Sequence, residues 1–472
     1  MPSATGSNPP PAEGSGRRRI DRERLRRLQA RELDSFATSH PKSRALHERA
    51  LGSMLGGVPM PWMARWAGGF PLYAARAAGA QIVDVDGHAY VDLCLGDTGA
   101  MGGHSPPATV EAVRAQLERG TTMMLPTEDG IRTAEDLERR FRMKYWQFTL
   151  SATDANRAAL RFARQITGRP KVLVHSYCYH GTVDEAFAIR APDGVTRSRE
   201  GNVGPAVDPG ATTRAVEFND VDQLAHALAD ESVACVLAEP AMTNMGIVLP
   251  APGYHDALRS LSRRHGTLLI IDETHTFSAG FGGCTRAWEL EPDFVTIGKS
   301  IGGGVPCGAL GMSAEVGRRI AAQEGADYED TGGVGGTLAG NALSAAAMRA
   351  TLERVLTEAA FARMISLAGE LQRSIRRVIE SRALPWNVVQ LGCRVEYGFR
   401  PTPAPNGSAA KAAADRDLES YLHLYLLNRG VLITPFHNMA LMSPATTPAD
   451  VALHDRLFAA AVDELIAADK TH

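Results

Sequence analysis

Three short apolar runs of the chain each end at a residue that can take part in chemistry. Glu239 follows VACVLA, Asp272 closes LLIID and Lys299 follows FVTIG. Ligands of open α/β sheets bind outside the carboxyl ends of the strands, so we expect the three side chains to converge on one site. A lysine and a carboxylate in these positions suit pyridoxal phosphate (PLP). The lysine forms a Schiff base with its aldehyde, and the carboxylate keeps its ring nitrogen protonated.

The segment TIGKSIGGGVP, residues 296–306, also contains Gly-Lys-Ser, the three residues with which a P-loop motif ends. A P-loop reads G-x-x-x-x-G-K-[ST], with its first glycine five residues before the second. Gly298 takes the second position here, but the first is occupied by Asp293. The remaining glycines follow Lys299, so the backbone cradle for phosphates is missing on the required side. We therefore interpret Lys299 as a Schiff-base lysine.

A phosphate site is predicted far upstream, in LSATDANRAALRFARQITG. Its apolar spacing predicts a helix that opens at Ser151, Ala152 and Thr153 and is capped by Gly168. The N–H groups at a helix N-terminus bind phosphate well. An ordinary N-cap is the commoner explanation of such an opening when it stands alone.

An aromatic pair follows the next expected strand. Tyr179 and His180, in SYCYHG, are candidates for stacking on a cofactor ring. Asp272 lies 27 residues before Lys299, about one strand–helix–strand step. The order and spacing of all these features together favour a PLP site.

The elements that must position these residues are predicted by the same patterns. Residues 171–176, 233–240, 266–273 and 293–299 read as buried strands, and helical segments such as GYHDALRSLSRRHG separate at least two of them. This alternation predicts an α/β fold with a mostly parallel sheet covered by helices. Asp86-Gly87, within 80–96, predicts a hairpin turn.

The domain organisation follows from composition along the chain. Residues 1–16 are rich in Pro, Gly and Ser, and we expect them to be disordered. We assign 17–100, with an N-terminal helix and the hairpin, to a small α+β domain. Residues 101–345 form the large PLP-binding domain, and 346–472 complete the small domain.

Overall composition excludes several classes of partner. The 472 residues carry 50 basic and 53 acidic side chains, a formal charge of −3, which does not favour nucleic acid or a membrane surface. We find no membrane-spanning stretch and expect no metal site. Six scattered cysteines without a C-x-x-C pair indicate reduced thiols and a cytoplasmic protein.

As a set, the motifs resemble those of the fold-type I PLP enzymes, and within them the class III aminotransferases. The glutamate-1-semialdehyde aminomutase-like branch looks most similar. The resemblance runs from about Gly56 to the C-terminus. It is carried by DVDGHAYVDLCLGDTGAMGGHSPP, SATDAN, CYHG, AEPAMTNMG, IIDETHTFSAGFGG, GKSIGGGVPCGALG and GGTLAGNALS.

The resemblance implies roles for the residues that match the family's motifs. Lys299 would hold the Schiff base and move the proton, and Asp272 would pair with the ring nitrogen. Thr274 would pack on the ring face opposite Tyr179.

Further roles concern the rest of the cofactor. Ala152 and Thr153 would donate to the phosphate, Glu239 would lie near the cofactor and Asn244 near the ring hydroxyl. Thr337 would reach the phosphate bound by a neighbouring subunit, which implies a homodimer with shared sites.

One departure from the family bears on the substrate. The position that carries a carboxylate-binding arginine in the aminomutase branch falls on or next to Met63. Arg65, Arg394 and Arg400 are alternative partners for a substrate carboxylate. Trp62, beside Met63, predicts a bulky apolar entrance.

The sequence predicts a transaminase that works by a ping-pong cycle between an amino donor and a keto acid, ketone or aldehyde acceptor. An isomerase on the same scaffold, a 2,1-aminomutase or a racemase or epimerase, remains the alternative, since it would share Lys299 and Asp272. A non-catalytic protein with this fold is a third possibility, against which both residues argue.

Overall fold

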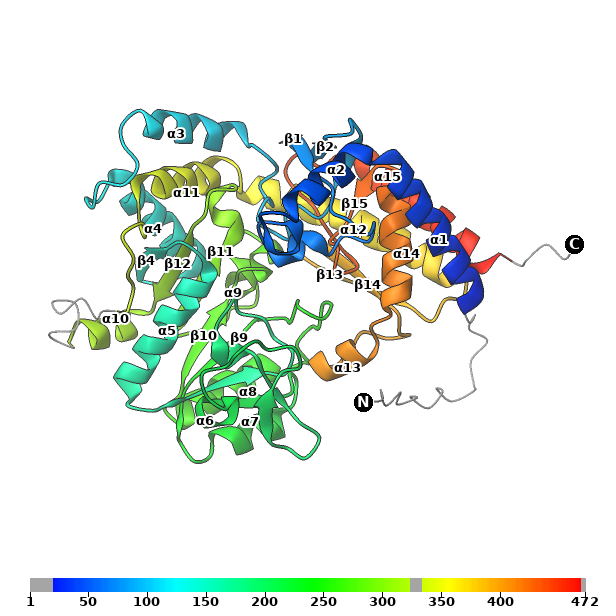
Figure 1. The fold of residues 1–472 in the computed structure, drawn as a ribbon. Coiled ribbons are helices and arrows are strands. Elements are labelled where there is room, and N and C mark those ends of the chain that lie inside the picture. The colour runs from blue at the N-terminus through cyan, green and yellow to red at the C-terminus, as the bar shows by residue number, and fades with distance from the viewer. Residues whose placement is uncertain (1–19, 323–332, 468–472) are drawn as a thin grey trace, which may run out of the picture.

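A seven-stranded sheet forms the centre of the larger of two lobes (Figure 1). The computed structural model describes residues 20–322 and 333–467, so the expected disordered tail, 1–16, lies outside the described residues. The strand order is β4 (Tyr145–Thr149), β12 (Gly308–Met312), β11 (Phe294–Gly298), β10 (Leu268–Asp272), β9 (Val233–Ala238), β5 (Lys171–His175) and β8 (Thr213–Val216).

The sheet is mostly parallel, as predicted. β10 pairs in parallel with β9 and β11, and β5 pairs in parallel with β9 and β8. β12 is antiparallel to both of its neighbours, β11 and β4. Every residue of β9, β10 and β11 is buried, because elements cover both faces of the sheet.

Helices of the large lobe pack on this sheet and on one another. α5 (Ala152–Thr167) lies against β9, β11 and β12, and α8 (Tyr254–Arg264) against β10. The remaining elements of the lobe are α3 (Pro107–Leu117), α4 (Glu128–Phe141), α6 (Pro209–Thr212), α7 (Val221–Leu228), α9 (Gly283–Ala287), α10 (Ala314–Ala321), α11 (Ala342–Arg354) and a ribbon of β6 (Ala188–Arg190) and β7 (Thr196–Ser198).

The smaller lobe joins the two ends of the chain. Figure 1 shows blue N-terminal helices beside orange and red C-terminal ones. Its elements are α1 (Arg22–Ser39), α2 (Pro41–Ala50), β1 (Ala74–Ala78), β2 (Gln81–Asp84), β3 (Ala89–Asp92), α12 (Glu358–Ser381), β13 (Asn387–Leu391), β14 (Arg394–Gly398), α14 (Arg416–Leu427), β15 (Val431–Leu432), β16 (Met439–Leu441) and α15 (Pro448–Ile466). The short helix α13 (Gly407–Ala412) packs on the large lobe instead, where Ser408 Oγ donates to Glu217.

Strand pairing ties these distant segments together. β2 and β3 form the hairpin expected around Asp86-Gly87, and the C-terminal β15 pairs in parallel with β3. The antiparallel set β13, β14 and β16 forms a second small sheet. The assignment of 17–100 and 346–472 to one domain, with limits at those residues, remains a prediction.

Two further expectations concern the chain as a whole. All six cysteines are buried and none forms a disulfide. Within the described residues, no helix combines the length and hydrophobicity needed to cross a bilayer.

Candidate active site

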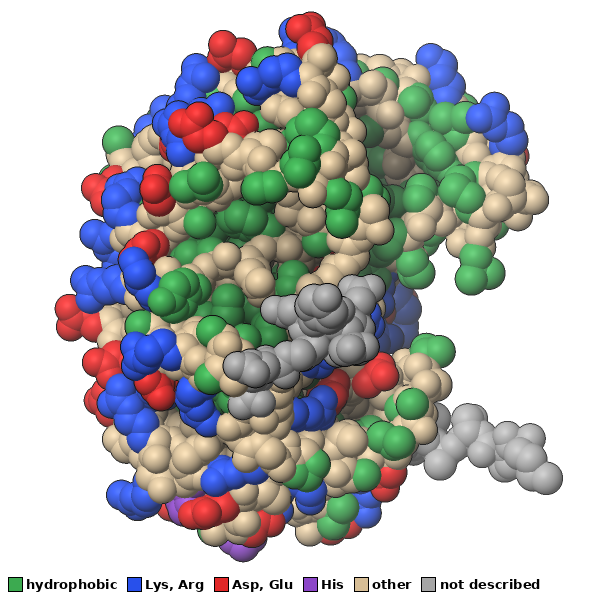
Figure 2. Space-filling model, turned by 90° about the vertical axis from the view of Figure 1, so that its left-hand side faces the viewer, with side chains coloured by type: hydrophobic (Ala, Val, Ile, Leu, Met, Phe, Trp, Pro, Cys, Tyr) green, Lys and Arg blue, Asp and Glu red, His purple; other side chains and the backbone are tan. Residues whose placement is uncertain are grey.

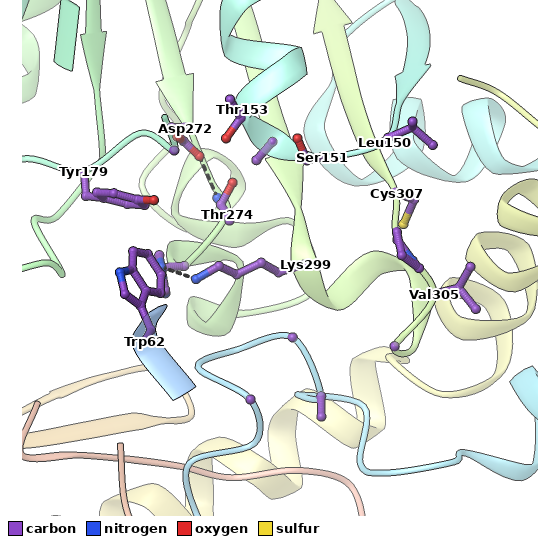
Figure 3. Close-up of a pocket in the computed structure, with 18 of the residues that line it drawn as sticks. Trp62, Leu150, Ser151, Thr153, Tyr179, Asp272, Thr274, Lys299, Val305 and Cys307 are labelled. Atoms are coloured by element: carbon purple, nitrogen blue, oxygen red, sulfur yellow. Dashed lines mark hydrogen bonds between the residues drawn. The ribbon is translucent and has the colours of Figure 1, made fainter. Parts of the chain in front are cut away.

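A cavity of about 450 Å³ lies at the carboxyl ends of β9, β10 and β11 (Figure 3). Volumes of this order are usual for small-molecule sites. Nine of the residues singled out from the sequence line it: Trp62, Ser151, Ala152, Thr153, Tyr179, Glu239, Asp272, Thr274 and Lys299. The predicted convergence of the strand ends at Glu239, Asp272 and Lys299 is therefore found in the structure.

The glycine before the lysine allows two elements to meet. A Cβ on Gly298 would lie 2.8 Å from the backbone nitrogen of Ala152, so only glycine lets β11 end against the start of α5. Lys299 itself has a φ of 51° and begins a single 3₁₀ turn, which Gly303 ends at a φ of 59°. The glycines behind Lys299 thus serve a tight turn after the strand.

The amine of Lys299 is held by residues that the sequence did not single out. Its Nζ lies 2.9 Å from Asp97 Oδ2, 3.1 Å from the backbone oxygen of Asp97 and 2.7 Å from His275 Nε2. Asp97 comes from the loop after β3, and His275 follows β10 by three residues. Both lie in motifs that had been matched to the family, but no pattern in the sequence marks them as partners of the lysine.

Asp272 sits at the end of β10 in a closed set of hydrogen bonds. Its Oδ2 accepts from Asn156 Nδ2 at 2.8 Å and from His180 Nδ1 at 2.9 Å, and its Oδ1 accepts from the backbone N–H of Thr274 at 3.0 Å. Burial alone would raise the pKa of Asp272, but His180, Thr274 and Asn156 lower it to about 2. The residue is therefore a carboxylate at neutral pH.

His180 supports Asp272 instead of stacking on a ring. It is fully buried and does not line the cavity, and its Nδ1 is occupied by Asp272. Burial acts to lower the pKa of His180, while Cys178 and Asp272 raise it well above 6.5. The expected stacking role of His180 does not fit this geometry, because its ring is committed to orienting the carboxylate.

Tyr179 and Thr274 lie on the cavity wall as expected. The Tyr179 ring meets the Trp62 ring edge-on, with centroids 5.3 Å apart (Figure 3). Among the described residues, Thr274 Oγ1 is a buried hydroxyl without a hydrogen-bond partner, on a wall of the cavity. A flat ligand beside Tyr179 and a polar partner for Thr274 are both consistent with a cofactor ring.

The opening of α5 has the geometry of an anion site. Ser151 caps the helix by accepting from the N–H of Asp154, and Gly168 ends it at a φ of 68°, both as predicted. The first N–H groups of a helix have no partner inside it, and those of Ala152 and Thr153 lie on the cavity wall. Thr153 Oγ1 accepts from the N–H of Thr182, which fixes that side chain.

Two other predicted cofactor contacts lie elsewhere. Asn244 lines a neighbouring cavity of about 690 Å³, and its side-chain N–H donates to the backbone oxygen of Tyr177. The structure does not bring it to the ring site, since the loop after β9 turns it away. Thr337 is exposed and does not line the cavity, and its contact with a partner subunit stays a prediction. Glu239 does line the cavity, where burial raises its pKa to about 7.

The arginines that we expected to bind a substrate carboxylate do not line this cavity. Arg394 is buried; its Nη2 donates to Thr98 Oγ1 at 2.6 Å and to His275 Nδ1 at 2.8 Å. It does not line the cavity, so its expected role as a carboxylate clamp is not supported. Arg65 lies over the Trp62 ring. Arg65 and Arg400 both line the neighbouring cavity.

Met63 does not face the cavity. Its side chain is 45% exposed and does not line the wall. The apolar entrance therefore depends on Trp62, whose ring contacts both Tyr179 and Phe436. The expectation that Met63 contacts substrate is not supported by this position.

Together these groups fit PLP. Lys299 would form the Schiff base with its aldehyde, Asp272 would pair with its ring nitrogen, and the start of α5 would offer N–H donors to its phosphate. Each group was expected from the sequence, and each lies on the wall of one cavity.

One cluster in the described part of the chain has the spacing of metal ligands. His40, Asp84 and His88 bring their ligand atoms within 4.8 Å of one another in the small lobe. The Tyr90 hydroxyl contacts both His40 and Asp84, and His88 Nδ1 contacts Asp84, so hydrogen bonds give each group a partner. We therefore do not assign a metal site to this cluster.

Comparison with known proteins gives consistent results. The family described as aminotransferase class-III matches residues 62–458. Glutamate-1-semialdehyde 2,1-aminomutase of Chloroflexus aggregans is 34% identical over 426 residues, covering 87% of this chain and 95% of that protein.

Two solved structures are similar to this one over at least 90% of the chain. A crystal structure of a glutamate-1-semialdehyde-aminomutase from Pseudomonas aeruginosa PAO1 is 48% identical with a TM-score of 0.92, and covers 95% of this chain and 100% of that one. An omega-transaminase from Sphaerobacter thermophilus is 29% identical with a TM-score of 0.82, and covers 90% and 98%. The chain belongs to the class III aminotransferase family of PLP-dependent enzymes.

Proposed function

We propose that the enzyme is an aminomutase, which moves an amino group between neighbouring carbons of one amino–carbonyl substrate. The observation that carries this proposal is the similarity to proteins named glutamate-1-semialdehyde 2,1-aminomutase, at 34% identity in one comparison and 48% in another, over nearly the full chain. The proposal favours the alternative function predicted from the sequence over intermolecular transamination.

Lys299 and Asp272 have different roles in the proposed reaction. PLP, when bound, supplies a ring that takes up the electrons left when a proton leaves the substrate carbon. Lys299 Nζ removes that proton and returns one. The Asp272 carboxylate, ionised because its pKa is held near 2, keeps a proton on the ring nitrogen.

A remote carboxylate of the substrate would be bound by Arg65. Arg394 is engaged with Thr98 and His275, and residue 63 is a methionine, so neither position offers a free guanidinium to the cavity. The Arg65 guanidinium lies within 5.8 Å of the Trp62 ring centroid and within 5.6 Å of that of Phe436. Arg65 therefore stands where the two cavities approach each other.

A transaminase that uses two different substrates is the second candidate. The position of the carboxylate-binding arginine of the aminomutase branch falls on or next to Met63. Trp62 and Tyr179 place aromatic rings on the cavity wall, which suits apolar groups, and Phe436 of the neighbouring cavity packs on Trp62. Similarity to an omega-transaminase at 29% identity is in line with this candidate.

A homodimer with shared sites also belongs to the proposal. Met123, Met124 and Leu125, in the loop between α3 and α4, are exposed, and so is Leu338 beside Thr337. Figure 2 shows hydrophobic side chains interrupting the charged surface of one face. Light scattering of the purified protein tests the dimer, and charged substitutions at Met124 and Leu125 should shift it towards monomer.

Multiple turnover on one substrate separates the two functions. The enzyme, loaded with pyridoxamine phosphate, is given glutamate 1-semialdehyde without any keto acid. An aminomutase consumes it over many cycles and forms the isomeric amino ketone. A transaminase could also use this substrate as both amino donor and acceptor, but it would form the diamine and the dicarbonyl compound in equal amounts instead of the isomeric amino ketone, which would overturn the proposal.

A further inference from the structure

We propose that the cavity beside the PLP cavity is a second binding site, which takes a zwitterionic amino acid. This neighbouring cavity, of about 690 Å³, lies between the two lobes. Its wall combines Glu396 of β14 and Glu419 of α14, in the small lobe, with residues 244–248 after β9, in the large lobe. The inference does not depend on which of the two reactions the enzyme catalyses.

A buried carboxylate oxygen on this wall has no partner. Glu396 is 6% exposed, and its Oε1 lies 3.4 Å from His437 Nδ1. Among the described residues, Glu396 Oε2 has no hydrogen-bond partner. A buried acceptor left without a donor costs free energy, which an N–H group of a ligand would recover.

A second carboxylate lines the same cavity. The Glu419 side chain makes no hydrogen bond or ion pair within the described part of the chain. Burial raises the pKa of Glu419; His437 opposes this, and the Glu396 carboxylate adds to it. A cation relieves the repulsion between two nearby carboxylates. An ammonium group, with three N–H donors, has enough donors for both Glu396 and Glu419.

A guanidinium without a partner lies on the same wall. Arg400 follows β14, and its side chain has no hydrogen bond or ion pair in the residues that the structure describes. Guanidinium groups bind carboxylates through paired, charge-assisted hydrogen bonds. Because Arg65 is assigned to the substrate, we assign Arg400 to the carboxylate of a ligand in the neighbouring cavity.

Charges of opposite sign are thus kept apart in one cavity. Glu396, Glu419 and Arg400 form no ion pair with one another, although all three line it. A simple amine would serve only the two carboxylates, and a simple carboxylate only the guanidinium. An amino acid serves both, with its ammonium group at Glu396 and its carboxylate at Arg400.

Calorimetric titration tests this site in holoenzyme whose PLP cavity is closed. The PLP-loaded protein is first reduced with borohydride, so that it forms no new Schiff base with an added amine. It is titrated with glycine, β-alanine, 4-aminobutyrate and 5-aminovalerate, whose charged ends are increasingly far apart, and with butylamine and butyrate, which carry one charge each. We expect at least one amino acid to bind at least about tenfold more tightly than both single-charge compounds.

Three variants locate the bound amino acid. Glu396→Gln keeps the shape of the side chain and should weaken binding of the amino acid and of butylamine by about tenfold or more. Arg400→Gln should weaken binding of the amino acid and of butyrate to a similar extent. Asp417→Asn, at an exposed acid of α14 outside the cavity, is the matched control and should change neither. The PLP absorbance of each variant before reduction, compared with wild type, checks that it is folded.

The outcomes separate this site from the proposed function. Amino acids that bind no more tightly than butylamine or butyrate would overturn the site. An equal loss in Asp417→Asn, or tight binding that survives both Glu396→Gln and Arg400→Gln, would also overturn it. Because the reduced enzyme does not turn over, these results leave the aminomutase proposal as it is, and products that identify a transaminase leave this site in place.

Discussion

The two ends of the cavity are built in different ways. At the ring end, Asp272 is supported by Asn156 and His180, with a hydrogen bond for each carboxylate oxygen. At the lysine end, Asp97 Oδ1 and Arg394 Nε have no partner among the described residues, and Asp97 Oδ2 accepts from the lysine amine. At the ring end both carboxylate oxygens of Asp272 have partners, although His180 Nε2 and Thr274 Oγ1 have none among the described residues, whereas at the lysine end one oxygen of the carboxylate itself has no partner.

This difference has a structural origin. Asp272, Asn156 and His180 come from the core elements of the large lobe, where strand ends and α5 are packed against one another. The lysine end combines Lys299 with Asp97, from the loop after β3, and Arg394, from β14 of the small lobe. The first region therefore lies within one lobe, whereas the second depends on contacts between the two lobes.

Loss of the lysine should have the largest effect. Lys299→Ala removes both the nucleophile and the proton carrier, so turnover should fall by at least about 10⁴-fold. The protein should still fold and bind PLP, because the ring end is unchanged. Turnover is measured with saturating substrate, and retained activity would show that the lysine end is not where the chemistry occurs.

Removal of the ring-end charge should come next. Asp272→Asn keeps the shape of the side chain but not the charge that holds a proton on the ring nitrogen. We expect kcat to fall by about 10²- to 10³-fold, the usual cost of losing one preorganised electrostatic partner. Asp154→Asn, at the start of α5, is the matched control, and an equal loss there would mean that any nearby acid has the same effect.

The hydrogen-bonded pair Asp272 and His180 should also contribute to the free energy of unfolding in a pH-dependent way. The pKa of Asp272 is lowered from 3.8 to about 2, so its contribution is present above 3.8 and is lost as the pH falls towards 2. The raised pKa of His180 makes its contribution complete below 6.5 and lost as the pH rises through the raised value.

The measurement compares urea unfolding of the apo wild type with that of Asp272→Asn/His180→Gln, in which neither group titrates. The free-energy difference should shrink by about 2 kcal/mol between about pH 5 and pH 2. A difference that stays constant over this range would mean that the pair is not coupled as described.

Substitutions at the cavity entrance should have the smallest effects, and these should be on KM. Trp62 lines the cavity with Tyr179 and also packs on Phe436 of the neighbouring cavity, so Trp62→Ala should raise KM by about tenfold, the cost of losing one or two kcal/mol of aromatic contact. Met63 is exposed outside the wall, and Met63→Ala should change KM by less than about twofold. The reverse order of the two effects would place the substrate on the other side of Trp62.

The same contrast explains what could be predicted from the sequence. The strand ends and the start of α5 were predictable because they depend on local patterns: apolar runs that end at Asp272 and Lys299, and a helix that opens at Ser151 and closes at Gly168. Elements of this kind carry their own periodicity and capping signals.

Contacts at the lysine end could not be predicted in this way. Asp97 and Lys299 are 202 residues apart, and His275 and Arg394 are 119 apart, so only the packing of the two lobes brings them together. His180 was placed on the wrong side of the cavity for a related reason. Its neighbour Tyr179 faces the ring site, whereas the turn directs His180 behind Asp272.

The central claim is that Lys299 is the residue that holds PLP. The most direct test loads the protein with PLP, reduces it with borohydride and locates the pyridoxyl group by mass spectrometry of its peptides. We predict modification of the peptide that contains Lys299, and its absence after Lys299→Ala. A pyridoxyl group on another lysine, or no stable adduct, would contradict the account.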